Sequence, residues 1–282
     1  MLIKFGETPQ RDLTPARIVL LLVHLIYGLV EWALENADRL RKGITNLLGK
    51  DREQEIAKQP EERQLELQSS LIEYGIRQLT KVPSHLVVIL GSEEPADAQQ
   101  LVKFIFWGMA AGVGHVSFYD HRGILKRNHH EMLSYVSRRP RTDSDQIVWT
   151  PQLKTAGGLL PPRNGYRRRI VVSFFCPEDG KGQLATTASN ISKSLVTGEL
   201  RTADQITIEL VDRKLQERFH HIPDPDLALY YGTLCTTYGL LPWHIRLTEF
   251  IPMEAPSLAE TRPTHFLNSL HRYARVQQRF GK

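Results

Sequence analysis

The sequence predicts an α/β domain with a mostly parallel sheet flanked by helices, preceded by an N-terminal membrane helix. Three observations support this prediction. Short β-branched runs alternate with helical stretches, the first three of these runs are almost wholly apolar, and a long apolar segment lies near the N-terminus. Such alternation is typical of parallel sheets with helices on both faces, whose strands are buried on both sides.

The composition is that of a globular protein rather than a repeat array or a disordered tail. The chain has 282 residues, of which 41% are hydrophobic and 24% charged, enough for a sizeable core. Lysine and arginine total 36 against 31 acidic residues, so the net charge of +5 gives no reason to expect nucleic acid as a partner. Cys176 and Cys235 are the only cysteines, which excludes a disulfide framework and any zinc site with several thiolates.

The apolar segment runs from Ile18 to Leu34 and reads IVLLLVHLIYGLVEWAL. As a helix its seventeen residues would span about 25 Å, at the short end of what crosses a bilayer. A cleaved signal peptide and a buried core helix are the alternatives. No small-x-small cleavage site follows, however, and apolar residues cover every face of the helix. We therefore predict that residues 1–36 form an uncleaved membrane anchor, with Glu31 at the interface beside Trp32.

The residues that flank this segment predict its orientation and the start of the globular domain. Three basic residues precede the segment and five follow it, so the positive-inside tendency puts the C-terminal part in the cytosol. Residues 37–64 include the highly charged run KDREQEIAKQPEERQ, interrupted by Pro60. We interpret them as a solvated linker and expect the globular domain to span residues 65–282.

Five strands and four helices are expected within the globular domain. The predicted strands are His85–Gly91, His115–Asp120, Arg169–Phe175, Asp226–Gly232 and Trp243–Phe250. The predicted helices are Ala96–Ala111, Arg122–Arg138, Lys181–Val196 and Ala203–Phe219. A stretch rich in Pro, Gly and Arg, residues 139–165, interrupts this pattern and is expected to be a surface insertion.

Ligands of parallel α/β sheets bind outside the carboxyl ends of the strands, so catalytic or binding side chains are expected at the predicted strand exits. After the first strand, Glu93 and Glu94 are possible metal ligands, but Pro95 and Asp97 favour the start of a helix. No glycine-rich fingerprint follows a strand and no phosphate-binding loop motif occurs, so nucleotide binding by those motifs is unsupported.

The third strand exit offers Asp179, Gly180 and Lys181 at a helix N-terminus, where backbone N–H groups can hold an anion. The alternative is an aspartate cap followed by a turn glycine, which we favour. Cys176 has no obvious histidine partner. Two histidine doublets lack a further ligand at helical spacing, so no metal site is predicted in this chain. These doublets are His129-His130 and His220-His221.

Basic residues gather at the two ends of the predicted insertion and at the C-terminus. The clusters that flank the insertion, Arg138, Arg139 and Arg141 with residues 167–169, are interpreted as solvated loop ends. From Thr261 to Lys282 there are five basic residues and no acidic one. After a cap at Thr264, a helix is expected to bury one apolar stripe, composed of Phe266, Leu270, Tyr273 and Val276. Its basic residues are expected to follow a second stripe that can attract anions.

The chain ends in Arg279-Phe280-Gly281-Lys282. A guanidinium can make two parallel bonds to phosphate oxygens, and a glycine lets backbone N–H groups approach closely. A frayed basic tail is the alternative interpretation of these four residues.

Several ordered motifs resemble the Nogo-B receptor family, the non-catalytic subunit of the eukaryotic cis-prenyltransferase, also called the dehydrodolichyl diphosphate synthase complex. The motifs are FYDHRGILKRN from Phe118, PEDGK from Pro177, IPDPDLAL from Ile222, GLLPWHIRLTEF from Gly239 and the terminal RFGK. The membrane segment followed by a cis-prenyltransferase-like domain is similar to the family layout. The strand expected at Trp243–Phe250 suits, by this resemblance, a sheet element near a subunit interface.

The sequence departs from the catalytic cis-prenyltransferases at two motifs. Their Asp-Gly-Asn-x-Arg motif, which holds the allylic diphosphate and magnesium, corresponds here to Leu90-Gly91-Ser92-Glu93-Glu94. Their Arg-Thr-x-Gly-Glu motif, which binds isopentenyl diphosphate, corresponds to YYGTLCTTYG from Tyr230 to Gly239. Without the aspartate and the arginines, two diphosphates and a metal cannot be neutralised, so the chain is expected to be inactive alone.

The resemblance implies an accessory subunit that pairs with a catalytic cis-prenyltransferase chain in a heterodimer or higher assembly at the endoplasmic reticulum membrane. Arg279, Phe280 and Gly281 would bind isopentenyl diphosphate across the interface, with Arg279 and Gly281 assisting catalysis, while Mg²⁺ would be held mainly by the partner and the substrate diphosphate. The complex would condense farnesyl diphosphate with isopentenyl diphosphates into the polyprenyl precursor of dolichol for protein glycosylation. A membrane-anchored binding protein or receptor that uses the domain as a scaffold is the alternative.

Overall fold

The computed structural model describes residues 22–29, 32, 51–139, 145–150, 168–219 and 222–277. The chain divides into two compact units, Met1–Arg52 and Glu53–Lys282. In the first unit, residues 22–29 are helical and their large apolar side chains are exposed. Within the described ranges, no helix combines the length and the apolar character needed to cross a membrane. Of the predicted membrane segment, Ile18–Leu34, only residues 22–29 and 32 are described.

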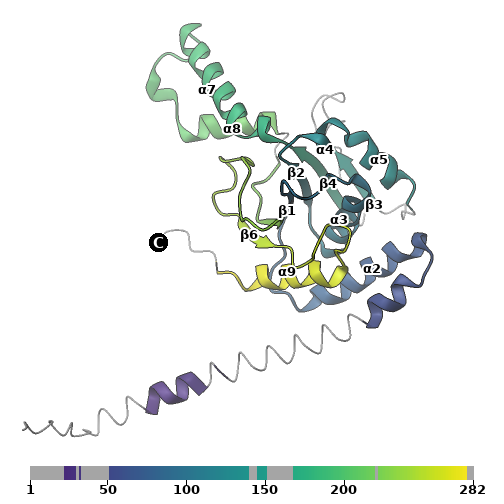
Figure 1. The fold of residues 1–282 in the computed structure, drawn as a ribbon. Coiled ribbons are helices and arrows are strands. Elements are labelled where there is room, and N and C mark those ends of the chain that lie inside the picture. Colours follow the sequence, from purple (N-terminus) through teal and green to yellow (C-terminus); the bar gives the residue numbers. More distant parts are fainter. Residues whose placement is uncertain are drawn as a thin grey trace, which may run out of the picture. The chain divides into compact units, whose positions relative to one another are not determined.

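The second unit is built on a six-stranded sheet in which every neighbouring pair of strands is parallel (Figure 1). The strands are β1 (His85–Leu90), β2 (His115–Asp120), β3 (Asp145–Trp149), β4 (Arg168–Phe175), β5 (Leu227–Tyr231) and β6 (Glu249–Pro252). They lie in the order β3-β4-β2-β1-β5-β6. The chain therefore leaves β1 toward one edge of the sheet and later returns to its other side, so that the order reverses between β1 and β5. The predicted parallel α/β architecture is confirmed.

One face of the sheet is covered by four helices. They are α2 (Glu61–Gly75), α3 (Ala98–Ala111), α5 (His129–Ser137) and α9 (Pro263–Arg275). Figure 1 shows α2 and α9 side by side below the sheet, and α3 also contacts α2, α5 and β4. The aromatic rings of Phe104, Trp107 and Phe266 meet at centroid distances of 5.4 to 6.0 Å in this layer, and all three side chains are fully buried. The largest part of the hydrophobic core lies here.

The opposite face carries a smaller core, which includes Val87 and Ile89 of β1. Leu215 of α8 (Ile208–Arg218) and the segment 240–245 pack on it. The helix α7 (Lys181–Val196) pairs with α8, and Figure 1 shows the two extending away from the sheet. Both helices were predicted within a few residues, and the short helices η3 (Ala203–Gln205) and η2 (Pro177–Asp179) precede α8 and α7.

The predicted linker, residues 37–64, overlaps the compact unit, which begins at Glu53 rather than near Leu65. The Glu53 side chain is 7% exposed, and its Oε1 accepts a hydrogen bond from the Thr264 backbone N–H at 2.8 Å. Arg262 lies 3.8 Å from the same carboxylate. This charged segment therefore begins the domain because one of its acids stabilises the N-terminus of α9.

Two strands differ from their predictions. The stretch 139–165, expected to be a surface insertion, contains β3, whose Val148 and Trp149 are buried against β4. The strand expected at Trp243–Phe250 is wrong for most of its length, because His244 and Ile245 donate backbone hydrogen bonds to Leu241 and close a turn. β6 begins only at Glu249.

Along this segment the His244 side chain is buried, while Leu247 is 52% exposed. Leu241, with a φ of 26°, starts the turn in the left-handed region.

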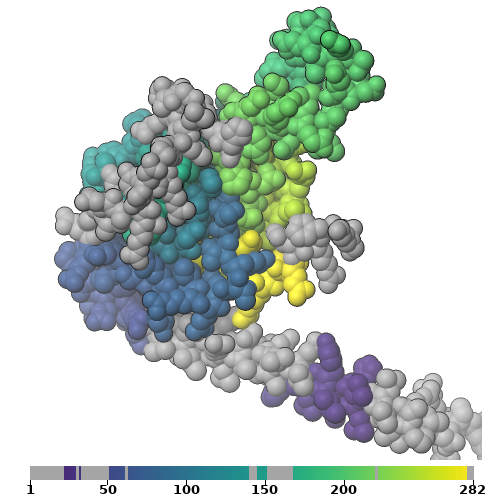
Figure 2. All heavy atoms as spheres, turned by 180° about the vertical axis from the view of Figure 1, so that it is seen from behind, coloured from purple at the N-terminus to yellow at the C-terminus, as the bar shows by residue number. Residues whose placement is uncertain are grey.

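The segment expected to be a single helix at Arg122–Arg138 divides into α4 (Ile124–Arg127) and α5, with a break at Asn128. The final helix buries Phe266, Leu270 and Tyr273 as predicted. Its cap is Arg262 rather than Thr264, and Val276 lies just beyond its end in an extended conformation. The space-filling view from behind shows the yellow residues of α9 bordering blue residues from the start of the unit (Figure 2).

Candidate functional site: the pocket at the carboxyl ends of β1 and β5

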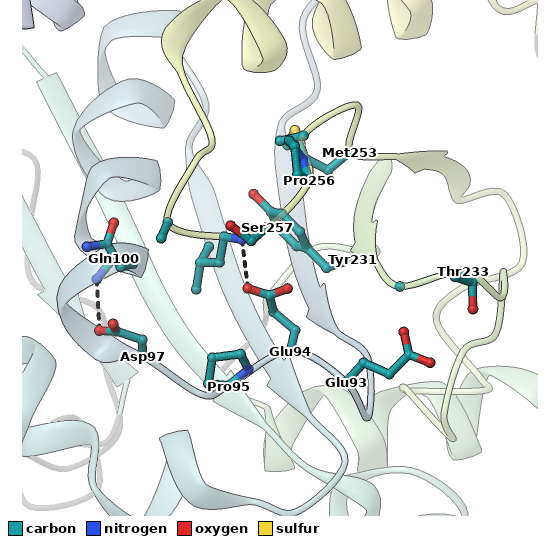
Figure 3. Close-up of a pocket in the computed structure, with 14 residues that line it drawn as sticks. Glu93, Glu94, Pro95, Asp97, Gln100, Tyr231, Thr233, Met253, Pro256 and Ser257 are labelled. Carbon is teal, nitrogen blue, oxygen red and sulfur yellow. Dashed lines mark hydrogen bonds between the residues drawn. The ribbon is translucent and has the colours of Figure 1, made fainter.

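A cavity of about 660 Å³ lies where the strand order reverses, which is where parallel α/β sheets bind ligands. Its walls come from the segment after β1, from the end of β5 at Tyr231 to Thr233, and from the loop after β6, residues 253–259 (Figure 3). We call this cavity the strand-exit pocket.

The charged side chains that line the strand-exit pocket are all acidic: Glu93, Glu94 and Asp97. Figure 3 shows Glu94 on the side of Ser257 and Glu93 on the side of Thr233. Glu94 Oε1 accepts a hydrogen bond from the Leu258 N–H at 2.6 Å. Asp97 caps α3, because its Oδ1 accepts from the Gln100 N–H at 3.1 Å. The interpretation of this segment as a helix start is confirmed.

The exits of β1 and β5 lie directly against each other. The Gly91 N–H donates to the Tyr231 carbonyl at 3.1 Å, and a Cβ built on Gly91 would lie 2.5 Å from that carbonyl oxygen. Leu90, which corresponds to the aspartate of the catalytic motif, is 1% exposed and belongs to the main core. Close backbone packing and an apolar side chain therefore occupy the positions that correspond, by the motif resemblance alone, to the first catalytic motif.

The segment from Tyr230 to Gly239, which corresponds to the isopentenyl-binding motif, contains no arginine and is fixed by its neighbours. The Tyr119 hydroxyl donates to the Tyr238 carbonyl. Gly180 packs so closely on the Gly239 carbonyl that a side chain at Gly180 would have no room.

At the third predicted exit, after β4, the N-cap of α7 is Gly180, which has no side-chain cap bond, so the favoured aspartate cap of this helix is wrong. Asp179 instead completes the capping box of the short helix η2, whose N-cap is Cys176. The Asp179 carboxylate accepts the Cys176 N–H at 3.0 Å and pairs with the Lys126 ammonium at 2.5 and 2.6 Å. Asp179 is 8% exposed, and the paired Lys126 ammonium balances its charge. Burial raises the pKa of the Cys176 thiol, which therefore stays protonated at neutral pH and is a poor nucleophile.

The other predicted groups have structural roles or lie outside the description. His129 Nδ1 contacts the Lys126 carbonyl at 3.1 Å, and its ring meets that of His130 edge-on. Arg168 makes two bonds to Asp145, at 2.7 and 2.8 Å, and a third to Glu73. The second histidine doublet, Arg141 and Arg167, and the predicted site residues Arg279, Phe280 and Gly281 lie outside the described residues.

Sequence reasoning missed Lys103 of α3, which supports the wall of the strand-exit pocket. Its ammonium donates to the carbonyls of Leu258 and Thr261 at 2.6 and 3.1 Å. Burial lowers the pKa of Lys103 to about 8. No spacing in the sequence could have paired this lysine with carbonyls more than 150 residues away.

Comparison with known proteins places the chain in a family. No family model matches the sequence. The mouse protein named dehydrodolichyl diphosphate synthase complex subunit Nus1 is 30% identical over 209 residues, which cover 73% of this chain and 68% of the mouse protein. This chain belongs to the Nus1 family. The resemblance drawn from the sequence motifs is thereby confirmed.

Other Nus1 proteins give the same result. The human subunit is 29% identical over 209 residues, which cover 73% of this Nus1-family chain and 69% of the human protein. The Saccharomyces cerevisiae subunit is 27% identical over 242 residues, covering 75% of this chain and 63% of the yeast protein.

Among solved structures, lavandulyl diphosphate synthase from Lavandula x intermedia, in complex with dimethylallyl diphosphate, has a similar fold. The TM-score is 0.54 at 17% identity, covering 71% of this Nus1-family chain and 99% of that structure. A likeness at this identity concerns the fold alone.

Proposed function

We propose that this Nus1-family chain is the non-catalytic subunit of a dehydrodolichyl diphosphate synthase complex. Together with a catalytic cis-prenyltransferase subunit, in a heterodimer or higher assembly, it would help to condense farnesyl diphosphate with isopentenyl diphosphates into the long precursor of dolichol. The observation that carries this proposal is the acidic lining of the strand-exit pocket in a chain of this family.

The charge of the strand-exit pocket argues against catalysis by the chain alone. Both substrates are diphosphates, and an active site must neutralise their negative charge with cations and hydrogen-bond donors. None of the residues that line the pocket is basic, and Glu93, Glu94 and Asp97 would repel the substrates.

The packing of the main core also supports a non-catalytic role. Between α3, α5 and the sheet, the cavity lined by Leu125, Met132 and Phe174 measures only about 10 Å³, room for about one water molecule. The growing polyprenyl chain would therefore need a tunnel supplied by the catalytic partner.

The chemistry of the reaction calls for Mg²⁺, which the described residues of this chain are not arranged to bind. In the part of the chain that the structure describes, no three His, Cys, Asp or Glu side chains come together as metal ligands. By the resemblance to the family, Mg²⁺ would be held mainly by the partner subunit and the substrate diphosphate.

The contribution of this chain to the reaction is assigned to its C-terminal tail. The Arg279 guanidinium would make paired hydrogen bonds to the diphosphate of isopentenyl diphosphate, and the backbone N–H groups around Phe280 and Gly281 would add further donors. Such contacts orient the nucleophilic double bond and stabilise charge at the partner's site. The basic residues of α9 that precede the tail support this assignment.

A membrane location completes the proposal. The exposed apolar side chains of residues 22–29 and of Trp32 fit an environment of lipid better than one of water. The proposed location is the endoplasmic reticulum membrane, with the C-terminal domain in the cytosol.

The test of the tail is Arg279→Ala, assayed as isopentenyl incorporation by the purified complex at sub-saturating isopentenyl diphosphate. We expect turnover to fall at least tenfold while co-purification with the partner is unchanged, because a bidentate charged contact contributes about 1.5–3 kcal/mol. Arg279→Lys should recover part of the loss, and Gln278→Ala is the neighbouring control. Wild-type turnover in Arg279→Ala would refute the role of the tail and favour a binding or receptor protein that uses the domain as a scaffold.

A further inference from the structure

The C-terminal end of α9 is held by two side chains from a distant part of the chain. The Thr80 hydroxyl donates to the Ala274 carbonyl at 3.2 Å, and the Lys81 ammonium donates to the Val276 carbonyl at 2.6 Å. The last carbonyls of a helix have no partner within it, and a cation is favoured there because the helix end carries partial negative charge. Both contacts therefore stabilise the point at which the chain leaves α9.

Lys81 makes a second contact at the same place. Its ammonium lies 4.5 Å from the centroid of the Tyr273 ring, and Tyr273 is 4% exposed. A lysine over a buried aromatic face gains a cation–π interaction. The neighbouring residues Leu79 and Val82 pack against the main core, so the segment that carries Lys81 is itself anchored.

The backbone changes direction at this point. α9 ends at Arg275, and Val276 adopts an extended conformation with φ −70° and ψ 125° while its N–H still donates to the Tyr273 carbonyl at 3.0 Å. The bond from Lys81 fixes the carbonyl of this first extended residue. It thereby fixes the direction in which the following residues start.

We propose that Thr80 and Lys81 form a clamp that sets the path of the C-terminal tail and so positions Arg279. This inference rests on the proposed function of the tail. Arg279 follows Val276 by three residues, which span at most about 10 Å when extended. A fixed carbonyl at Val276 therefore restricts where the Arg279 guanidinium can reach, and a released one lets the tail sample many more directions.

The clamp predicts a specific kinetic effect. Ordering one additional residue on substrate binding costs a factor of about 5 to 30 in affinity, since fixing one backbone residue opposes binding by that amount. Loss of the clamp should therefore raise the KM for isopentenyl diphosphate about tenfold and change kcat at saturation by less than twofold. Thr80 and Lys81 are thus positioning residues and do not touch the substrate.

The experiment uses the full-length chain in complex with its catalytic partner. Lys81→Met keeps the length and apolar stem of the side chain but removes the donor. Lys81→Arg keeps a cation that can reach the Val276 carbonyl. Lys58→Met is the control at an exposed lysine. We expect Lys81→Met to raise KM about tenfold and Lys81→Arg to restore it to within about threefold of wild type. Hydrogen exchange of the peptide from Val276 to Lys282 should become faster in Lys81→Met and stay unchanged in Lys81→Arg and Lys58→Met.

Thr80→Val gives a second, milder variant, with an expected two- to threefold rise in KM. It keeps the proposal testable if Lys81→Met assembles poorly.

Arg279→Ala in the same assay separates the two proposals. If Arg279→Ala raises KM but Lys81→Met and Thr80→Val do not, the clamp is refuted while the tail keeps its role. If none of the three changes KM, both proposals fail. If Lys81→Met raises KM and the double variant Lys81→Met/Arg279→Ala is no worse than Arg279→Ala alone, the clamp acts through Arg279 as proposed.

Discussion

Gly91→Ala tests the finding that the exits of β1 and β5 close on each other. The new Cβ would lie 2.5 Å from the Tyr231 carbonyl oxygen, whereas Cβ atoms essentially never approach closer than 3.0 Å. The two strand ends must then separate by at least 0.5 Å, the difference between these distances. That shift also lengthens the bond from the Gly91 N–H to the same carbonyl, now 3.1 Å.

Overpacking costs about 1–3 kcal/mol and the weakened hydrogen bond about 1 kcal/mol, so we expect Gly91→Ala to destabilise the domain by about 3 kcal/mol. Residues 53–282 form a unit of 230 residues, for which this corresponds to a fall in Tm of roughly 6–12 °C. Thermal unfolding of the full chain, followed by circular dichroism, measures it.

Gly182→Ala is the matched control, because nothing lies within 4 Å of a Cβ built at that exposed glycine near the start of α7. We expect its Tm to equal or slightly exceed that of the wild type, since alanine favours a helix over glycine. A Tm of Gly91→Ala within 2 °C of the control would refute the reasoning, because the strand ends would then have room for a side chain.

Three further outcomes follow from particular side chains. Burial lowers the pKa of His85 from 6.5 to about 4, so between these pH values the unfolded chain binds a proton that the folded chain does not. The free energy of unfolding, measured with urea, should therefore fall by about 2 kcal/mol from pH 7 to pH 5, and by less in His85→Gln. Arg168→Met removes three charge-assisted hydrogen bonds and should lower the free energy of unfolding by about 2–4 kcal/mol. The control Arg138→Met should lower it by less than about 0.5 kcal/mol, and equal losses would contradict the assigned contacts. Lys103→Met should lower the free energy of unfolding by about 2 kcal/mol and speed hydrogen exchange in residues 258–261. Unchanged exchange would show that Lys103 does not hold that loop.

Local pattern was sufficient to predict the centre of the sheet. β1 and β2 are short runs that lie between helices and are buried along most of their length. β1 is apolar apart from His85, and β2 carries Val116, Phe118 and Tyr119, which favour a strand. β3 could not be predicted, because a short edge strand within a stretch rich in Pro, Gly and Arg has no such pattern. The segment from Trp243 was wrongly predicted as a strand, because hydrogen bonds from His244 and Ile245 to the Leu241 carbonyl close a turn there.

The candidate site likewise has parts that the local sequence pattern predicts and parts that it does not. The cap at Asp97 depends on residues three positions apart, so the sequence predicted it. Asp179 is held by Lys126, which lies 53 positions away, and its predicted cap of α7 is wrong. The loop that forms one wall of the strand-exit pocket and the clamp at Lys81 depend on contacts between residues more than 150 positions apart, which no local pattern encodes.

The most direct test of the central claim is isopentenyl incorporation with farnesyl diphosphate and Mg²⁺, measured for this chain alone, for a catalytic cis-prenyltransferase subunit from the same source alone, and for the two together. A non-catalytic subunit that is needed by its partner predicts no incorporation by this chain, little by the partner, and full activity in the mixture. Incorporation by this chain alone, or a partner whose full activity is unchanged by its addition, would contradict the account.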